Sequence, residues 1–250
     1  MNSRTPSVIS SVRATPVRED TLRGQPDTVA QLLLGRMSRG GEVNRPKWCL
    51  DYASDLVKVQ QADGSWKAGG QLPSQKRPQR ETQEVSTMWS LLALSTADVR
   101  NDPAASAALN NARTWLGEKT MGRSTEWWAT RLMFERKLGS ADKADHFRAG
   151  LVKRQRADGG WGWLCDEDSD ALGTGIALYA LAQDHLPASD PVVVNARRFL
   201  LQTQQGDGSW PVRGTKMNKK DHVQPTATYW GTCWAVIGLC ETLAPLEASP

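Results

Sequence analysis

The sequence QQADGSW at residues 60–66 returns as QRADGGW at 155–161 and as QQGDGSW at 204–210. A fixed motif that recurs at intervals of tens of residues is typical of repeat proteins. We call this motif the Gln–Trp cassette. Its Asp-Gly pair favours a chain reversal, because glycine adopts positive φ without steric cost. The motif predicts structural roles, at the connections between repeats, for Gln60, Trp66, Gln155, Trp161, Gln204 and Trp210.

The segments that lead into the cassettes, and one further segment, have the pattern of amphipathic surface helices. Asp190-Pro191 is a typical helix start, with a capping carboxylate followed by proline at the first helical position. Asp102-Pro103 repeats this start, and Ser140 is a third capping residue. Apolar residues then recur at helical spacing, with charged residues between them. Together with residues 46–60, these segments predict four outer helices.

The segments that follow are of a different kind, because residues 85–97, 172–182 and 225–240 contain no charged side chain. A helix that is apolar all round is buried on all sides. A shared threonine marks each of these segments, at Thr87, Thr174 and Thr232, with a weaker copy at Thr125. Alternating surface and buried helices predict an all-α fold, an incomplete αα-toroid of about four helical hairpins with inner and outer layers.

The predicted domain covers residues 26–245. Residues 1–25 are rich in Ser, Pro and Arg and are expected to form a disordered tail. An apolar segment from Asp27 to Leu34 resembles an inner helix that has no outer partner. Because four hairpins leave a toroid open, we expect the chain to be part of a longer protein or to form a homodimer through its open edge.

Composition excludes several classes of function. The net charge is only +4 and the basic residues are scattered, which argues against nucleic-acid binding. The longest uncharged stretch, residues 224–240, is too short and too polar for a transmembrane helix. Four cysteines without a CxxC pair indicate a reducing compartment. These features predict a soluble, cytoplasmic protein.

The cassettes resemble the QW motifs of squalene–hopene and oxidosqualene cyclases and of protein prenyltransferase β subunits, with the closest copy at residues 199–210. The similarity covers roughly residues 45–243. It implies a toroid with peripheral cassettes and a central apolar cavity between the inner helices. The same fold hosts cyclases, transferases and non-enzymatic domains, so the motif does not specify the chemistry.

The catalytic motifs of these families are not preserved. The Asp-x-Asp-Asp acid of the cyclases corresponds here to Asp170-Ala171-Leu172-Gly173, in which only the first residue matches. The zinc site of the prenyltransferases lacks two of its three ligands, because Gly231 stands in place of the histidine and Asp168-Ser169-Asp170 in place of the Asp-x-Cys pair. Neither a metal nor another cofactor is therefore expected, although Cys165, Asp166 and His222 could form a rebuilt zinc site. Weak catalytic candidates are Asp166, Asp168 and Asp170, which could equally cap the buried helix that follows.

Two groups of residues are candidates for ligand binding. Aromatic residues on the buried helices could line an apolar cavity, or could be ordinary core residues: Trp89, Trp127, Trp128, Tyr179, Trp230 and Trp234. Basic residues in the loops after two cassettes could form an anion-binding rim beside inner-helix N-termini, or could be solvated: Lys76, Arg77, Arg80, Lys216, Lys219 and Lys220.

The sequence leaves two functions open. The first is a domain similar to terpene cyclases or prenyltransferases that binds an apolar, isoprenoid-type small molecule, with its catalytic activity in doubt. The second is a non-catalytic helical repeat module that binds a protein partner. A third class, a carbohydrate-active αα-barrel, requires convergent carboxylates, which residues 166–170 could supply.

Overall fold

The computed structural model describes residues 25–37, 47–69, 75–96, 103–117 and 121–243. Apart from Gln25, the predicted disordered tail lies outside the described residues.

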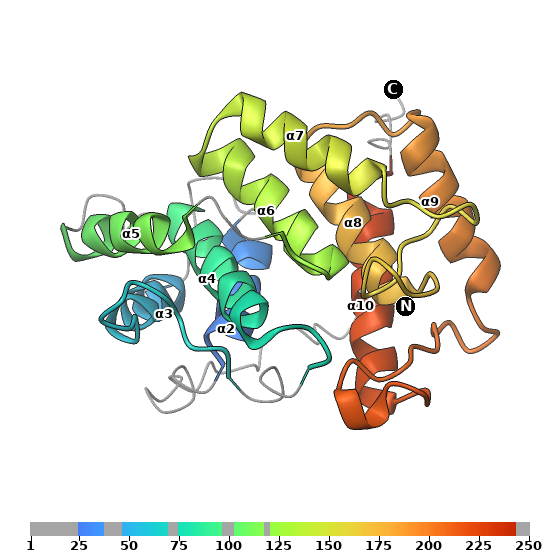
Figure 1. The fold of residues 1–250 in the computed structure, drawn as a ribbon, viewed down its shortest axis with the longest axis horizontal. Coiled ribbons are helices and arrows are strands. Elements are labelled where there is room, and N and C mark those ends of the chain that lie inside the picture. Colours follow the sequence, from blue (N-terminus) through green and yellow to red (C-terminus); the bar gives the residue numbers. More distant parts are fainter. Residues whose placement is uncertain (1–24, 38–46, 70–74, 97–102, 118–120, 244–250) are drawn as a thin grey trace, which may run out of the picture.

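The helices of the described residues form two layers around an arc (Figure 1). The inner layer consists of α2 (Pro26–Met37), α4 (Gln79–Thr96), α6 (Thr125–Leu138), α8 (Ala171–Gln183) and α10 (Pro225–Glu241). The outer layer consists of α3 (Lys47–Lys58), α5 (Pro103–Leu116), α7 (Ala141–Val152) and α9 (Pro191–Thr203). Successive inner helices pack against each other, and β-structure in the described ranges is limited to isolated bridges. The prediction of an all-α toroid is confirmed.

Local sequence explains where the outer helices begin. Asp190 caps α9, and its side chain accepts a hydrogen bond from the backbone N–H of Val192 at 2.9 Å. Ser140 caps α7 in the same way through the N–H of Lys143. Asp102 lies outside the described residues. The buried sides of these helices carry small or apolar residues at helical spacing, which is the pattern expected for helices packed on an inner layer.

The inner helix α4 begins at Gln79, six residues before the uncharged segment that predicted it. Its first turns contain Arg80 and Glu84, so Arg80 belongs to a helix and not to a loop. The Glu84 carboxylate is buried, but it accepts hydrogen bonds from Arg80 at 3.0 Å and from the indole of Trp127 at 2.8 Å. Charged residues are tolerated in this inner helix because their polar groups are paired.

The cassettes join the two layers by one repeated set of hydrogen bonds. Each tryptophan indole N–H donates to a carbonyl in the last turn of the preceding outer helix, at 2.8–2.9 Å. Each tryptophan backbone N–H donates to the repeated threonine of the next inner helix, at 3.0–3.2 Å. The three sets are Trp66 with Leu56 and Thr87, Trp161 with Leu151 and Thr174, and Trp210 with Leu200 and Thr232.

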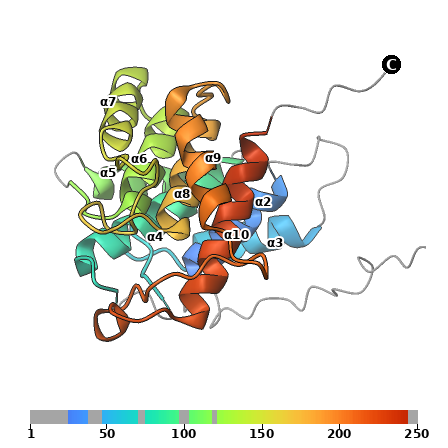
Figure 2. The same cartoon turned by 90° about the vertical axis from the view of Figure 1, so that its right-hand side faces the viewer.

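Two inner helices of similar composition have different surroundings. Residues 171–178 of α8 are buried without interruption, which agrees with its lack of charge. The helix α10 is equally uncharged before Glu241, but it packs mainly against α8 and exposes Tyr229 and Val236. Seen from the side in Figure 2, α10 lies at the front, and no described helix covers it.

In the described part of the chain, the helices lack the combination of length and hydropathy that a membrane crossing needs.

Candidate functional site

A cavity of about 490 Å³ lies between the inner helices, near the N-termini of α2, α6, α8 and α10. Loop residues before α4 and α10 complete its wall. Two carboxylates line it, Asp27 in the first turn of α2 and Glu126 in the first turn of α6. Residues far apart in the sequence therefore meet here because the toroid places the starts of the inner helices together.

Asp27 is the more unusual of the two carboxylates. It is 92% buried, and its Oδ1 atom has no hydrogen-bond partner among the described residues. Burial, together with the nearby charge of Glu126, raises the pKa of Asp27 to about 7. The nearby Arg77 counteracts this rise only in part. At neutral pH Asp27 is therefore partly protonated and can donate a proton.

Glu126 has a different environment within the same cavity. One of its carboxylate oxygens accepts a hydrogen bond from Arg77 at 2.8 Å, and the other accepts one from the indole of Trp89 at 3.1 Å. Arg77 itself is buried, and it is held by the hydroxyls of Thr82 and Ser124. Both donors bind the carboxylate form of Glu126. The cavity thus contains one carboxyl group that retains a proton beside another that is paired with a cation.

Two further buried polar atoms at this cavity lack partners in the described residues. They are Oε1 of Gln75, which lines the cavity, and Nη2 of Arg77, which adjoins Glu126. A buried polar atom that stays unpaired costs about 1–3 kcal/mol. At the cavity wall, Oδ1 of Asp27 and Oε1 of Gln75 are therefore two acceptors available to a polar ligand.

Aromatic rings form the apolar wall of the cavity. Trp163, Trp230 and Trp234 line it. Trp234 stacks on Trp89 with ring centroids 5.7 Å apart, and Tyr179 packs against its ring at 5.5 Å. Of the six aromatic residues predicted from the sequence, Trp230 and Trp234 lie at this cavity, whereas Trp89 and Tyr179 support Trp234.

The other two predicted aromatic residues lie elsewhere. Trp127 is buried and donates its indole N–H to Glu84. Trp128 is also buried, and it forms the floor of a second pocket between α6 and α7. Both tryptophans follow Glu126 on α6. Because each residue of a helix is rotated by about 100° from the one before it, their rings point away from the central cavity that Glu126 lines.

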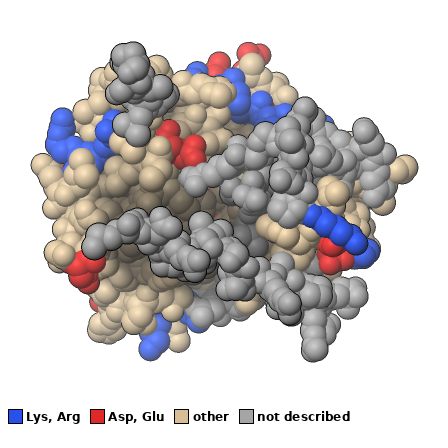
Figure 3. All heavy atoms as spheres, turned by 180° about the vertical axis from the view of Figure 1, so that it is seen from behind, with Lys and Arg blue, Asp and Glu red and all other residues tan. Residues whose placement is uncertain are grey.

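The predicted basic rim is divided among several environments. Lys76 forms an ion pair with Glu167 at 2.6 Å, and Arg80 lies over the ring of Trp115. Lys216 and Lys219 line the central cavity, whereas Lys220 is exposed. The two loops do meet, because Gln75 pairs with Lys216 in an antiparallel bridge. On the rear face, basic and acidic groups are small and separate (Figure 3), so no continuous basic stripe is visible there.

The acidic cluster 166–170 lies outside the cavity. Asp170 caps α8, where its carboxylate accepts hydrogen bonds from the backbone N–H groups of Gly173 and Trp163 at 2.7 and 2.8 Å. Burial raises the pKa of Asp170 to about 6 in spite of these bonds. Asp166 and Asp168 are exposed. The three side chains therefore do not converge on a common point inside the toroid.

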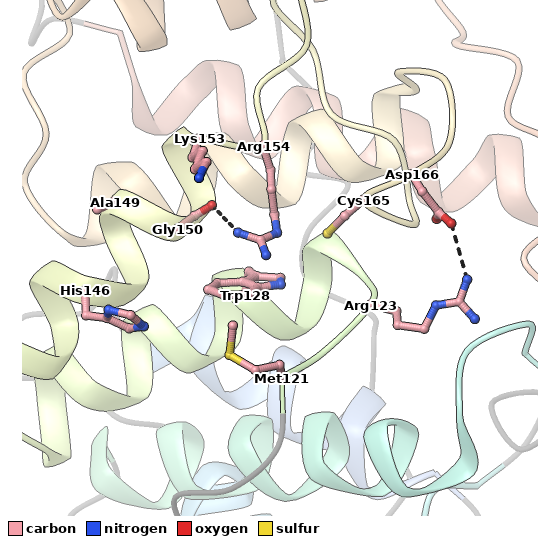
Figure 4. Close-up of a pocket in the computed structure, with 10 residues that line it drawn as sticks. All are labelled: Met121, Arg123, Trp128, His146, Ala149, Gly150, Lys153, Arg154, Cys165 and Asp166. Carbon is pink, nitrogen blue, oxygen red and sulfur yellow. Dashed lines mark hydrogen bonds and ion pairs between the residues drawn. The ribbon is translucent and has the colours of Figure 1, made fainter.

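The second pocket, of about 720 Å³, is larger but chemically simpler (Figure 4). Arg154 stacks on Trp128, with its guanidinium carbon 3.5 Å from the ring centroid. Cys165 lies beside Arg154, and burial raises the pKa of its thiol. Asp166, the only carboxylate among the described residues that line this pocket, is paired with Arg123 at 3.3 Å. The described lining therefore supplies no pair of carboxylates for acid–base chemistry.

The described residues contain no group of three or more His, Cys, Asp or Glu side chains arranged to hold a metal ion. Cys165 and Asp166 line the second pocket, whereas His222 is exposed in the loop before α10. The rebuilt zinc site considered above therefore has no basis in the described structure.

Comparison with known proteins identifies the fold. No family model and no curated protein matches the chain. Among solved structures, a wild-type glycosidase has a TM-score of 0.56 and 16% sequence identity, covering 87% of this chain and 67% of its own. A variant of UGL, an unsaturated glucuronyl hydrolase, with the oligosaccharide dGlcA-Glc-Rha-Glc has a TM-score of 0.54 and 17% identity, covering 92% and 77%. At this identity the similarity shows the shared toroid alone.

These neighbours correct the family prediction. The chain was expected to resemble squalene cyclases and prenyltransferases and to bind an isoprenoid, or else to be a non-catalytic interaction module. Both expectations are wrong, because the structural neighbours are glycosidases with α/α toroids. The error has a physical cause. The cassette forms hydrogen bonds between an outer helix and an inner helix, and such a junction is useful in any α/α toroid whatever its chemistry.

Sequence reasoning missed Asp27 and Glu126 as site residues. Each is an acidic residue in the first turn of a helix, where a carboxylate is normally explained by the helix dipole. Trp163, which follows the second cassette, was also missed. The available signal was positional, because inner-helix N-termini share one end of a toroid and acidic residues there converge.

Proposed function

We propose that the chain is a glycoside hydrolase that cleaves its substrate in the central cavity. The observation that carries this proposal is the pair of unlike carboxylates, Asp27 and Glu126, at the start of two inner helices in one aromatic-lined cavity. Glycoside hydrolysis requires two such groups, one to protonate the leaving oxygen and one to act as base or nucleophile. The glycosidase neighbours support the same reading at the level of the fold.

In this proposal Asp27 is the general acid. Its raised pKa keeps a proton available near neutral pH. Glu126 is the second carboxylate, held by Arg77 and Trp89 so that it faces the cavity with a fixed orientation. The rings of Trp163 and Trp230 provide flat apolar surfaces for the C–H faces of sugar rings. The unpaired Oε1 atom of Gln75 would accept a hydrogen bond from a sugar hydroxyl.

The test is hydrolysis of a panel of 4-nitrophenyl glycosides and reducing-end-labelled oligosaccharides by the purified chain. Replacing Asp27 by Asn or Glu126 by Gln should lower kcat by about 10²–10⁴-fold, the usual contribution of acid–base catalysis. Asp168→Asn is the matched control, because this carboxylate is exposed outside the cavity. Full activity of Asp27→Asn, or a folded wild type that hydrolyses nothing in the panel, would contradict the proposal.

The same Asp27→Asn variant has a second readout that does not depend on the substrate. Because the pKa of Asp27 is raised, the folded state binds more protons than the unfolded state between about pH 4 and pH 7. The contribution of Asp27 to stability is therefore complete below about pH 4 and is lost as the pH rises through 7. We expect the variant to exceed wild type in unfolding free energy by on the order of 1–3 kcal/mol at pH 8, and by much less at pH 5. Urea denaturation at both pH values measures the difference.

A further inference from the structure

Two of the three cassettes hold a neighbouring outer helix by the same contacts. Gln60 donates to the carbonyl of Ala108 in α5 at 2.8 Å, and Gln155 donates to the carbonyl of Val192 in α9 at 2.9 Å. The cassette glycine then packs closely against the residue three positions further along that helix. A Cβ on Gly64 would lie 2.6 Å from the carbonyl of Asn111, and one on Gly159 would lie 2.6 Å from that of Asn195.

The two helices held in this way share a sequence signature. Residues 111–113 and 195–197 both read Asn-Ala-Arg. The asparagine packs on the cassette glycine, and the alanine is fully buried. The arginine reaches the C-terminal end of the following inner helix, where Arg113 donates to Leu138 at 2.6 Å and Arg197 to Thr242 at 3.5 Å. The described outer helices α3 and α7, which receive no cassette, lack this tripeptide.

The third cassette has the same internal geometry but holds no helix. Gly208 has a φ of +84°, close to the values at Gly64 and Gly159, and the indole of Trp210 donates to Leu200 as in the other copies. Among the described residues, however, the Gln204 side chain donates only to the carbonyl of Gly208, within its own turn. A Cβ on Gly208 would meet nothing closer than the Gln204 side chain at 3.9 Å. The third cassette therefore has the surface on which an outer helix packs in the other two copies, which we call the vacant seat, and no described helix occupies it.

An apolar stripe continues from this vacant seat along α10. Tyr229, Cys233, Val236 and Cys240 recur at a spacing of three or four residues, and all four are at least partly exposed. Tyr229 is 64% exposed and Val236 is 47% exposed. No charged residue interrupts the stripe, and no described helix covers it (Figure 2), so an apolar helix face packed there would bury apolar surface. We call the third cassette and this stripe the open edge.

We propose that the open edge binds an amphipathic α-helix of a partner polypeptide, in the position that α5 and α9 occupy on the first two cassettes. This position continues the interface that α9 forms with the second cassette, and the two occupied seats define the ligand. The partner helix presents a free carbonyl to Gln204, a small residue four positions later and an apolar face toward Tyr229 and Val236. This inference does not depend on the proposed glycosidase activity.

The experiment uses the full chain and a fluorescein-labelled, helix-stabilised peptide that copies residues 190–204, with a hydrocarbon staple on its solvent face. Fluorescence anisotropy should show saturable binding. Val236→Asp should weaken the affinity at least tenfold, because it places a charge in the stripe, and Gln204→Ala should weaken it a few-fold. Met121→Asp is the control, because Met121 is also an exposed apolar residue but lies beside the second pocket.

Three outcomes would overturn the proposal. The first is no binding of the stapled peptide up to 1 mM to a folded chain, and the second is binding that Val236→Asp leaves unchanged. The third is a dimer, found by analytical ultracentrifugation, that Val236→Asp dissociates, because the open edge is then the contact between two copies. Hydrolytic activity measured in parallel separates these outcomes from failure of the proposed function, since Val236 does not line the central cavity.

Discussion

The helices α8 and α10 share a lack of charge but have different surroundings. The contrast separates the structure that a sequence forms locally from the structure that depends on neighbouring helices. Both follow a cassette, both begin near a buried tryptophan and both are uncharged through most of their length. Within the described part of the chain, α8 is buried along most of its length, whereas α10 exposes Tyr229 and Val236. The turn before each helix is the same in both places. An outer helix packs on the second cassette, but no described outer helix packs on the third. The turn of the cassette therefore forms without an outer helix packed on it.

The strongest test of this comparison is removal of the cassette tryptophan at each site. Trp161→Ala should lower the free energy of unfolding by about 3–5 kcal/mol, the usual cost of deleting a buried tryptophan. Trp210→Ala should lie at the lower end of that range or below it, because the vacant seat beside the third cassette allows the cavity to collapse. Urea denaturation followed by far-UV circular dichroism measures both values. A larger loss for Trp210→Ala would mean that the two junctions are not equivalent.

A smaller and sharper contrast is expected at the cassette glycines. Gly159 and Gly208 have φ values of +90° and +84°, so alanine pays the same conformational cost of about 1–2 kcal/mol at either position. Only at Gly159 does the new Cβ also meet a backbone carbonyl, that of Asn195 at 2.6 Å. Gly159→Ala should therefore be more destabilising than Gly208→Ala by at least about 1 kcal/mol.

Thermal unfolding of the two glycine variants in parallel gives this difference directly. Gly64→Ala is the matched control, because its φ is +91° and a Cβ there would also meet a backbone carbonyl at 2.6 Å. It should behave like Gly159→Ala. If all three variants lose the same unfolding free energy, close packing of an outer helix on the cassette glycine does not contribute to stability. The occupied and vacant seats would then be energetically equivalent.

The architecture could be predicted from the sequence because its signals are local. A capping residue such as Asp190 stabilises the first turn of the helix that follows it. The absence of charged residues from a helix indicates that the helix is buried. The repeated threonines were visible as a pattern, but their role was not. Thr174 accepts the backbone N–H of Trp161 across a junction, and no rule of helical periodicity concerns such a bond. The Asn-Ala-Arg signature escaped notice for the same reason.

The candidate site was not predictable in the same way, because it depends on which helix ends meet in space. The sequence directed attention to the conspicuous cluster at 166–170, whose clearest member, Asp170, caps a helix. Asp27 and Glu126 stand alone in the sequence, and 99 positions separate them. Their interaction arises only when α2 and α6 align in the inner layer. The resemblance to cyclases added a further error, since it suggested an isoprenoid ligand on the basis of a motif that serves the fold.

The smallest expected effect is at the cassette glutamines, and it tests the comparison most specifically. Gln155 donates to two carbonyls, of Gly159 at 2.8 Å and of Val192 at 2.9 Å, and both bonds are partly buried. Gln204 makes one such bond, and it is exposed. At about 1 kcal/mol for a buried hydrogen bond, Gln155→Ala should cost roughly 1–2 kcal/mol, whereas Gln204→Ala should cost less than about 0.5 kcal/mol.

Denaturation of the two glutamine variants in the presence of the stapled 190–204 peptide then distinguishes two explanations. If the open edge lacks only its helix, saturating peptide should stabilise wild type by mass action and stabilise Gln204→Ala less, so that the cost of this substitution rises toward that of Gln155→Ala. If the cost of Gln204→Ala stays unchanged while peptide binds, the peptide occupies another surface, and the third cassette is a terminus of the repeat with no seat to fill.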